Sequence, residues 1–459
     1  MREKIMPLLP SCQKKRKKLL IITSSGGGGL LQAANAKEQE ARANNPNVII
    51  IRKDVLKDWI GKGFGRFCCN QWNMAQIKGD VSALKWLIFA QIFFDYLCWP
   101  NFFIRSLIIL FKENIDQVID TQPMGTSAIL KAIRIYNWRK HKRLKLEKVL
   151  VDLPTKKATH FFRPIKRLGK ADRAFFKLIT ISPLLEEGQT AQDFWWKNCR
   201  LSESDVCYED VYVRQSFRKF KNKQKSTEAF PLFVRYKTKE ELSLLKKSCD
   251  RSLINTEVKG DEVHFVIPPQ AYVLTVLLGS QPASEATFNY VKKFAQIARE
   301  ENCPKVPIYL FVFCAEQQAR EMSLFRRVSE YVCRMKEYPK NFSVIPFSFQ
   351  SDDVIAPLFY RSNLTCTRSG GQTAMELMCI GSGEIWIHSE TKWIDKKKEP
   401  SLSQLLDGIP GWEAANACYL QKLRNAKIVT PGSFAPLARR FFRSHESPIT
   451  ALKDFQSIA

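Results

Sequence analysis

Two short apolar runs separated by a glycine-rich turn and a helical stretch constrain the fold of this chain most. Leu19–Thr23 leads directly into Ser24, Ser25 and the four glycines Gly26–Gly29. Helix-forming residues follow, and Asn47–Arg52 is again apolar and β-branched. This order predicts strand, turn, helix and strand, which is the beginning of a βαβ unit.

The same alternation of apolar strands with helical stretches recurs along the rest of the chain. Further strand candidates are Val149–Leu153, Tyr272–Leu278, Val306–Cys314, Phe342–Ile345, Ser362–Thr367 and Glu384–His388. With 459 residues, the chain is long enough for two or three domains with sizeable cores. We therefore expect an α/β protein with mostly parallel sheets.

Charge indicates the class of partner more than the fold. The formal net charge is +27, and basic clusters lie at residues 134–148, 156–173 and 214–225. Anionic lipid, nucleic acid and phosphorylated substrates would all be attracted. No recognisable nucleic-acid module accompanies the clusters, so we expect no nucleic-acid partner. The thirteen cysteines include no CxxC pair, and we read them as reduced thiols without a metal site.

Residues 83–113 are the most apolar part of the chain. Asp95, Pro100, Asn101 and Arg105 interrupt the stretch, so a single spanning helix is not expected. Two helices broken near Pro100 fit better, either packed in a core or lying in a membrane interface. In the second case the membrane contacts would be Trp86, Phe93, Trp99, Phe102 and Phe103. With the basic clusters, this predicts peripheral association with the cytoplasmic side of an anionic membrane.

A second glycine-containing turn follows the strand candidate that ends at Thr367. Arg368–Gly371 would open a helix, whose free N–H groups, with nearby hydroxyls, make a cradle for an anion. Glu376 follows Thr373 by three residues on the same helical face, where it could accept hydrogen bonds from a sugar diol. The structural alternative is a capping role for Ser369 and a solvated Glu376.

These residues carry a resemblance to a known family. Arg368, Gly370, Thr373, Glu376 and Gly381 stand in the order R-x-G-x-x-T-x-x-E-x-x-x-x-G. This order resembles the nucleotide-sugar signature of inverting glycosyltransferases related to bacterial lipid-intermediate N-acetylglucosaminyltransferases, plant monogalactosyldiacylglycerol synthases and bacterial diacylglycerol glucosyltransferases. Further similar segments are the Ser24–Gly29 loop, Leu277–Ser280, Glu413 with Asn416 and Ala417, and Val151–Thr155 with His160–Phe162.

The resemblance implies a glycosyltransferase-B fold, in which two doubly wound, Rossmann-like domains face a cleft. We expect a basic tail over 1–18, an acceptor- and membrane-facing α/β domain over 19–265, a nucleotide-sugar-binding domain over 266–432, and a helical segment over 433–459 that packs back on the N-terminal domain. Within the first domain, 83–113 would form the apolar helices and 185–262 an insertion.

The resemblance also implies a UDP-sugar donor, a lipid or membrane-presented acceptor, inversion without a metal, and no further cofactor. The implied donor-binding residues are Ser25, Gly26, Gly27, Gly28, Gly29, Gly279, Ser280, Thr367, Arg368, Ser369, Gly370, Gly371, Thr373, Glu376, Glu413 and Asn416. Arg368 and the two helix N-termini would stabilise the departing nucleoside diphosphate.

The catalytic base departs from the family pattern. The lipid-directed relatives carry a His directly after the first glycine loop, where this chain has Gly29 and Leu30, and Gln122-Pro123 replaces a His-Pro pair. The remaining candidates for the base are Asp152, His160 and Asp120, and Asp116 is a further acidic residue that could serve. Two alternatives are a 2-epimerase-like enzyme on the same fold and a non-catalytic, basic, membrane-docking scaffold.

Overall fold

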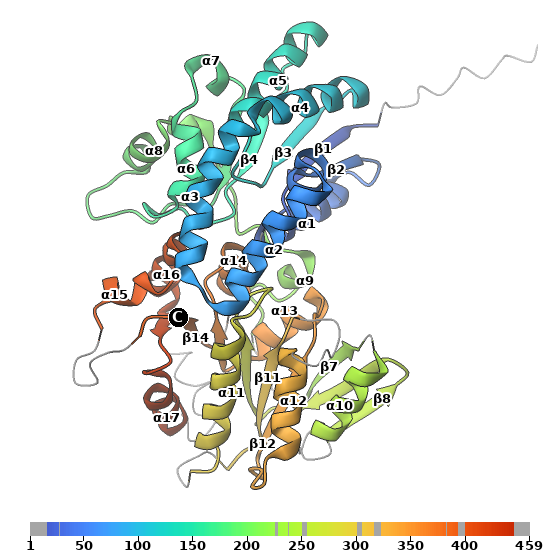
Figure 1. Ribbon diagram of the computed structural model, residues 1–459, viewed down its shortest axis with the longest axis vertical. Coiled ribbons are helices and arrows are strands. Elements are labelled where there is room, and N and C mark those ends of the chain that lie inside the picture. Colours follow the sequence, from blue (N-terminus) through green and yellow to red (C-terminus); the bar gives the residue numbers. More distant parts are fainter. Residues whose placement is uncertain are drawn as a thin grey trace, which may run out of the picture.

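The computed structural model describes residues 16–26, 28–224, 228–236, 238–249, 255–300, 305–315, 323–381, 383–392 and 400–444. Most of the predicted basic tail, Gly27 and residues 445–459 lie outside the described residues. Two parallel sheets, each flanked by helices, form the upper and lower parts of the molecule in Figure 1.

The first sheet has six strands in the order β2-β1-β3-β4-β5-β6. Its strands are β1 (Lys18–Thr23), β2 (Ile49–Asp54), β3 (Gln117–Asp120), β4 (Leu146–Val149), β5 (Phe176–Thr180) and β6 (Val206–Tyr208). Its helices include α1 (Gly28–Asn44), α5 (Thr126–Lys140), α6 (Thr159–Lys166), α7 (Lys170–Arg173) and α8 (Ala191–Cys199), with the short turn η2 (Glu203–Asp205) before β6. Leu19–Ile22 is buried throughout, as a continuous apolar run in a covered parallel strand should be.

The second sheet also has six strands, in the order β12-β11-β10-β13-β14-β15. They are β10 (Tyr272–Leu277), β11 (Ile308–Phe313), β12 (Phe342–Phe347), β13 (Leu364–Thr367), β14 (Glu384–His388) and β15 (Lys427–Val429). The helices are α11 (Ser284–Ile297), α12 (Leu324–Arg334), α13 (Asp352–Arg361), α14 (Gly371–Ile380), α15 (Leu402–Asp407), α16 (Gly411–Arg424) and α17 (Phe434–Ser444). All pairings within both sheets are parallel, so the expected fold class is confirmed.

One predicted strand is shifted. The candidate Val149–Leu153 is strand only up to Val149, because β4 covers Leu146–Val149. Val151, Asp152 and Leu153 leave the sheet at its carboxyl edge, where the Leu153 N–H donates to the Asn416 Oδ1 of α16 at 2.6 Å. The second half of the molecule therefore holds this loop in place.

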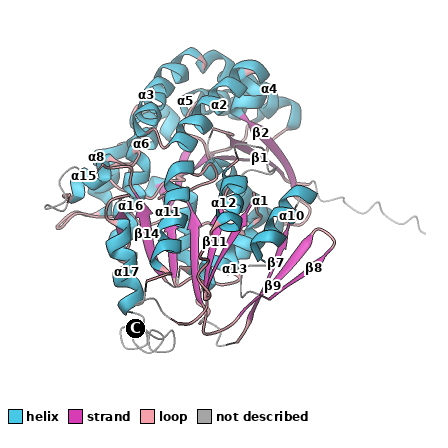
Figure 2. Cartoon of the chain, turned by 60° about the horizontal axis from the view of Figure 1, so that its bottom comes forward, coloured by secondary structure: helices cyan, strands magenta, loops and turns pink. Residues whose placement is uncertain are grey.

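The predicted insertion at 185–262 contains regular structure that its polar composition conceals. Besides α8 and β6 it contains α9 (Gln215–Arg218), β7 (Phe230–Arg235), α10 (Lys239–Cys249) and β8 (Asn255–Lys259), and it ends at the first residue of β9 (Glu262–Ile267). Strands β7, β9 and β8 form a separate antiparallel sheet, visible beside α10 in Figure 2. Phe265 of this sheet contacts Phe311 and Phe347 of the second parallel sheet at ring distances of 6.3 and 6.1 Å.

This packing differs from the predicted domain division. A boundary at residue 265 falls inside β9, whose Phe265 contacts the second parallel sheet. Helix α17 also differs from the expectation, because Phe434 stacks on Tyr290 of α11 at 4.1 Å, within the C-terminal half. It is α16 that reaches the N-terminal half, where the Tyr419 hydroxyl donates to the Ser182 carbonyl at 2.7 Å.

The apolar stretch forms two helices, as expected. After η1 (Val55–Ile60) and α2 (Lys62–Lys78), α3 (Val81–Leu97) and α4 (Trp99–Glu113) are separated by Cys98, with Pro100 in the first turn of α4. Within the described residues, no single helix meets the length and apolarity needed to cross a bilayer; α3 and α4 meet them only as a pair, bent by 63°.

Large apolar side chains remain exposed on α2 and α3. We call this surface the apolar face; it consists of Phe64, Phe67, Trp86, Phe89, Phe93, Tyr96 and Leu97. Trp86 and Phe93 of the predicted membrane set are 65% and 67% exposed, whereas Trp99 and Phe103 are half-buried and stack on each other. Phe102 needs correction: it is fully buried and packs on Trp59 at 6.1 Å, because it lies on the inner side of α4.

Candidate functional site

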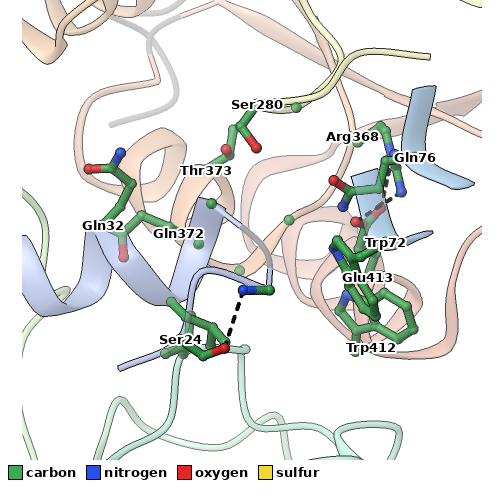
Figure 3. Close-up of a pocket in the computed structure, with 18 of the residues that line it drawn as sticks. Ser24, Gln32, Trp72, Gln76, Ser280, Arg368, Gln372, Thr373, Trp412 and Glu413 are labelled. Atoms are coloured by element: carbon green, nitrogen blue, oxygen red, sulfur yellow. Dashed lines mark hydrogen bonds and ion pairs between the residues drawn. The ribbon is translucent and has the colours of Figure 1, made fainter. Parts of the chain in front are cut away.

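A cavity lies between the two halves, at the carboxyl ends of β1 and β3 in one sheet and β10 and β13 in the other. In each sheet the strand order reverses at this point, which is where ligands bind in open α/β sheets. The cavity volume is about 290 Å³, and both halves line it. Figure 3 shows side chains from both halves gathered around it, among them Ser24, Gln32, Ser280 and Thr373.

The two glycine-rich turns meet across this cavity. A Cβ on Gly28, the first residue of α1, would lie 2.6 Å from Ser280 Oγ, and one on Gly371, the first residue of α14, would lie 2.3 Å from the Val151 carbonyl oxygen. Only glycine permits so close an approach. Gly279 has φ +94, a conformation that also favours glycine. The glycines are thus needed for contact between the halves as well as for the turns.

The beginnings of α1 and α14 supply donors for an anion. The first N–H groups of a helix have no partner within it and carry the positive end of the helix dipole. The hydroxyl-bearing Ser24, Ser280 and Thr373 line the same space. Ser24 Oγ also accepts from the Gly26 N–H at 3.2 Å, which stiffens the first turn. This arrangement is suited to phosphate oxygens.

The structure separates the predicted donor residues into two groups. Those lining the cavity are Gly26, Gly28, Gly29, Gly279, Ser280, Arg368, Gly370, Gly371, Thr373, Glu376 and Glu413. Ser25, Thr367, Ser369 and Asn416 do not line it, and Gly27 lies outside the described residues. The Thr367 hydroxyl donates to the Arg368 carbonyl at 2.9 Å and the Ser369 hydroxyl to the Glu413 carbonyl at 2.7 Å. These two hydroxyls bind backbone carbonyls and so stabilise the turn. They do not have the ligand contact that the sequence predicted for them.

Arg368 and Glu413 pair with each other. Arg368 Nε donates to Glu413 Oε2 at 3.0 Å and Nη2 donates to Oε1 at 3.1 Å, so both carboxylate oxygens are engaged. Both residues are buried, and burial raises the pKa of Glu413 while the Arg368 charge opposes that shift. The pair stiffens the cavity wall where the resemblance places the donor sugar.

Glu376 has a partner that the sequence did not reveal. Arg214, just before α9, donates from Nε and Nη2 to Glu376 Oε1 at 3.1 and 2.8 Å, although 162 residues separate the two in sequence. Burial raises the pKa of Glu376, and the Arg214 charge opposes it. Gln372, one turn earlier in α14, also lines the cavity. No sequence motif marks Arg214, which lies within the predicted insertion.

Two of the three predicted base candidates come together. His160 Nε2 lies 3.1 Å from Asp152 Oδ2, and both side chains line the cavity. Asn416 Nδ2 donates to Asp152 Oδ1 at 2.9 Å and to the Ser369 carbonyl at 2.8 Å. Asn416 therefore orients Asp152, and Asp152 orients the imidazole. If His160 donates from Nε2, the lone pair of Nδ1 is available as a base.

Asp120 is not placed to act as a base. Its carboxylate is fully buried, does not line the cavity, and pairs with Lys148 Nζ at 2.7 Å. Burial raises the pKa of Asp120, and Lys148 opposes this. Asp116 pairs with Lys142 at 2.9 Å and also lies away from the cavity lining. Both carboxylates form ion pairs within the protein, one just before β3 and the other at its last residue.

Helix α2 adds an aromatic wall that the sequence analysis did not single out. Trp72 stacks on Trp412 of α16 at 5.3 Å, and the His160 ring lies 5.9 Å from Trp412. Figure 3 shows these tryptophans beside Gln76, Arg368 and Glu413. Only the tertiary contact between α2 and α16 brings them together. In the described part of the chain, no group of three His, Cys, Asp or Glu side chains forms a candidate metal site.

The sequence matches no protein-family profile and no curated protein at a significant level. Solved structures of similar arrangement include MurG from Acinetobacter baumannii, at 11% identity and a TM-score of 0.42, covering 96% of this chain and 100% of that one. The glycotransferase of kitacinnamycin has 9% identity and a TM-score of 0.43, with 96% and 99% covered. UDP-GlcNAc 2-epimerase from Neisseria meningitidis, bound to UDP-GlcNAc, has 10% identity and a TM-score of 0.38, with 92% and 98% covered. Likeness at this level assigns the chain to no single family.

Proposed function

We propose that the protein is a glycosyltransferase that moves a sugar from a UDP-sugar to the hydroxyl of a lipid or membrane-presented acceptor. One observation carries the proposal: two glycine-rich helix beginnings, one from each parallel sheet, meet at a single cavity that also contains the Asp152–His160 pair. Helix N-termini suit the diphosphate. A carboxylate-oriented imidazole suits the removal of a proton from a hydroxyl.

In this reaction His160 takes the proton of the acceptor hydroxyl while the oxygen of that hydroxyl bonds to the anomeric carbon of the sugar. The bond from that carbon to the diphosphate oxygen breaks on the opposite face, so the configuration inverts, and the electron pair leaves with UDP. The N-termini of α1 and α14 would stabilise the negative charge on the diphosphate. Arg368 would contribute less than the resemblance implies, because two of its three donor nitrogens, Nε and Nη2, already bind Glu413.

The lipid part of the proposal rests on the apolar wall of the cavity. Leu56, Ile60, Leu87 and Phe94 line one side of it. Phe64 lines the cavity too, is 43% exposed, and contacts Phe94 at 5.4 Å, so the apolar wall continues onto the apolar face. Side chains of this kind bind well at a bilayer interface.

Basic side chains beside the apolar face support an anionic membrane as its partner. Arg167 Nη1 donates to the Tyr96 hydroxyl at 2.6 Å, and Arg66, Lys85 and Arg105 are exposed on α2 to α4. Each lysine or arginine near an anionic lipid surface contributes about 1 kcal/mol to binding. We therefore propose that the protein acts as a peripheral enzyme at the cytoplasmic face of a membrane.

Titration of the purified protein with UDP, UDP-glucose, UDP-galactose and UDP-N-acetylglucosamine, without added metal, tests the donor site. Binding to the native state must raise its thermal stability. We expect at least one nucleotide to bind, and the His160→Gln variant to bind it equally while transferring sugar to a vesicle-borne lipid acceptor about 10²–10⁴-fold more slowly. A folded protein that binds none of the four would contradict the proposal.

The apolar face is tested separately by vesicle sedimentation. The variant Phe89→Ser/Phe93→Ser should lose binding to vesicles of phosphatidylcholine with phosphatidylglycerol, because both side chains are more than 65% exposed on α3. Leu423→Ser, on α16, is a control at an apolar side chain that is 52% exposed and does not belong to the apolar face. Equal vesicle binding by all three proteins would remove the membrane from the proposal.

A further inference from the structure

The two oxygens of the Glu376 carboxylate have different surroundings. Arg214 Nε and Nη2 both donate to Oε1, and Gln372 Nε2 lies 3.4 Å from the same oxygen. Among the described residues, the hydrogen bonds to this carboxylate all reach Oε1, and Glu376 lines the cavity. An ionised carboxylate has about four acceptor positions, so Glu376 retains acceptor capacity on the side that Arg214 leaves open.

Arg214 is itself held in place by its neighbours. Its Nη1 lies 3.5 Å from Asp352 at the start of α13, and its guanidinium lies 4.9 Å from the centre of the Phe217 ring. The segment around it is tied to the second half, because the Ser216 hydroxyl donates to Asp353 Oδ1 at 2.6 Å. Gln372 Nε2 donates to the Tyr212 carbonyl at 3.3 Å. The arginine is therefore positioned before any ligand arrives.

Arg214 also supplies the charge that Glu376 requires. Glu376 is 3% exposed, and burial is the largest influence on its pKa, raising it; Asp352 raises it further. The Arg214 charge is the largest influence in the opposite direction. Without Arg214, the carboxyl would take up a proton more readily and would become a donor where an acceptor is needed.

We propose that Arg214 is a positioning residue for nucleoside recognition, which holds the Glu376 carboxylate by Oε1 and leaves Oε2 free to accept hydrogen bonds from the ribose hydroxyls of the donor. The inference rests on the proposed function and deepens it. It gives the segment before α9 a part in the nucleotide site and predicts selection for ribonucleotides over 2′-deoxyribonucleotides. A hydroxyl that donates to a charged acceptor contributes roughly 10- to 100-fold in affinity.

Calorimetric titration with UDP and with 2′-deoxy-UDP tests this assignment. The wild-type protein should bind UDP roughly 10- to 100-fold more tightly than 2′-deoxy-UDP. Arg214→Gln should lose most of this preference by binding UDP more weakly, with its affinity for 2′-deoxy-UDP nearly unchanged. Arg214→Lys should restore part of it, because it retains the charge without the fork of two donors.

Arg218→Gln is the matched control, since this arginine lies in the same segment, is half exposed, and donates to the Val213 carbonyl at 3.2 Å. It should keep the full preference. A folded Arg214→Gln variant that keeps the preference for UDP, or that binds both nucleotides more weakly by the same factor, would overturn this inference but not the proposed function. Wild-type protein that binds neither nucleotide would overturn the proposed function as well.

Discussion

The two buried arginine–glutamate pairs beside the cavity differ in how much of the carboxylate they use. Arg368 occupies both oxygens of Glu413 and comes from the same half of the chain, 45 residues away. Arg214 occupies one oxygen of Glu376 and comes from the predicted insertion, 162 residues away. The closed pair stiffens the wall, whereas the open pair leaves an acceptor for a ligand. The same two residue types thus serve different purposes, according to geometry.

Breaking the closed pair should have the largest effect. Glu413→Gln leaves the buried Arg368 charge without its bidentate partner, and loss of one member of a buried pair costs about 3–5 kcal/mol. We expect a fall of that size in the free energy of unfolding, measured by urea denaturation. Glu376→Gln should cost less, because Asp352 still faces Arg214 at 3.5 Å. Equal destabilisation by the two variants would contradict the distinction.

Breaking the open pair, Arg214 with Glu376, should mainly lower the affinity for the nucleotide. Glu376→Gln replaces the free carboxylate oxygen by an uncharged amide, and we expect UDP affinity to fall roughly 10- to 100-fold in calorimetry. Circular dichroism serves as the control for folding. A folded variant with unchanged UDP affinity would remove Glu376 from the nucleotide site.

Neighbouring glycines at the start of α14 provide a matched test of the contact between the halves. A Cβ at Gly371 would lie 2.3 Å from the Val151 carbonyl oxygen, while one at Gly370 would have nothing within 4 Å. Gly371→Ala should therefore cost about 1–3 kcal/mol in thermal or urea unfolding. Gly370→Ala should be nearly neutral. The opposite order would show that the halves do not meet as described.

The smallest expected effect is the pH dependence of UDP binding. Burial and Asp352 raise the pKa of Glu376, and Arg214 opposes them. As the pH falls through that raised pKa, the carboxylate takes up a proton and the affinity should fall, by no more than about tenfold per pH unit for one proton. The phosphates of UDP titrate as well, so Glu376→Gln is the reference. A wild-type profile identical to that of Glu376→Gln would show that this carboxylate does not control binding.

In the apolar helices α3 and α4, composition predicted where the helix breaks but not which aromatic side chains are buried. The break near Pro100 was predictable because proline cannot continue a helix from the preceding turn, and α4 does begin at Trp99. The side of the helix on which each aromatic lies was not. Phe102 and Phe103 are adjacent, yet the first is fully buried and the second half-buried, because only the packing of α4 determines which side faces the core.

At the candidate site, too, local features were predictable from the sequence, whereas contacts with distant segments were not. Strand–glycine–helix spacing predicted the two helix beginnings that line the cavity, because backbone N–H groups and the space for a close turn are local properties. The pairing of Asp152 with His160 involves residues only eight positions apart, but it depends on Asn416 of the opposite half. Asp120 was a candidate only as an acidic residue of the first half, and the buried Lys148 that pairs with it comes from the neighbouring strand β4.

Sequence patterns alone predicted the α/β class and the two glycine-rich turns that line the cavity. Each of these depends on short-range spacing and on which residues the backbone tolerates. Three-dimensional packing, by contrast, settles which charges are paired within the protein, brings Arg214 to Glu376, and stacks Trp72 on Trp412. Such contacts join segments far apart in the chain, and their strength comes from burial, which sequence spacing does not encode.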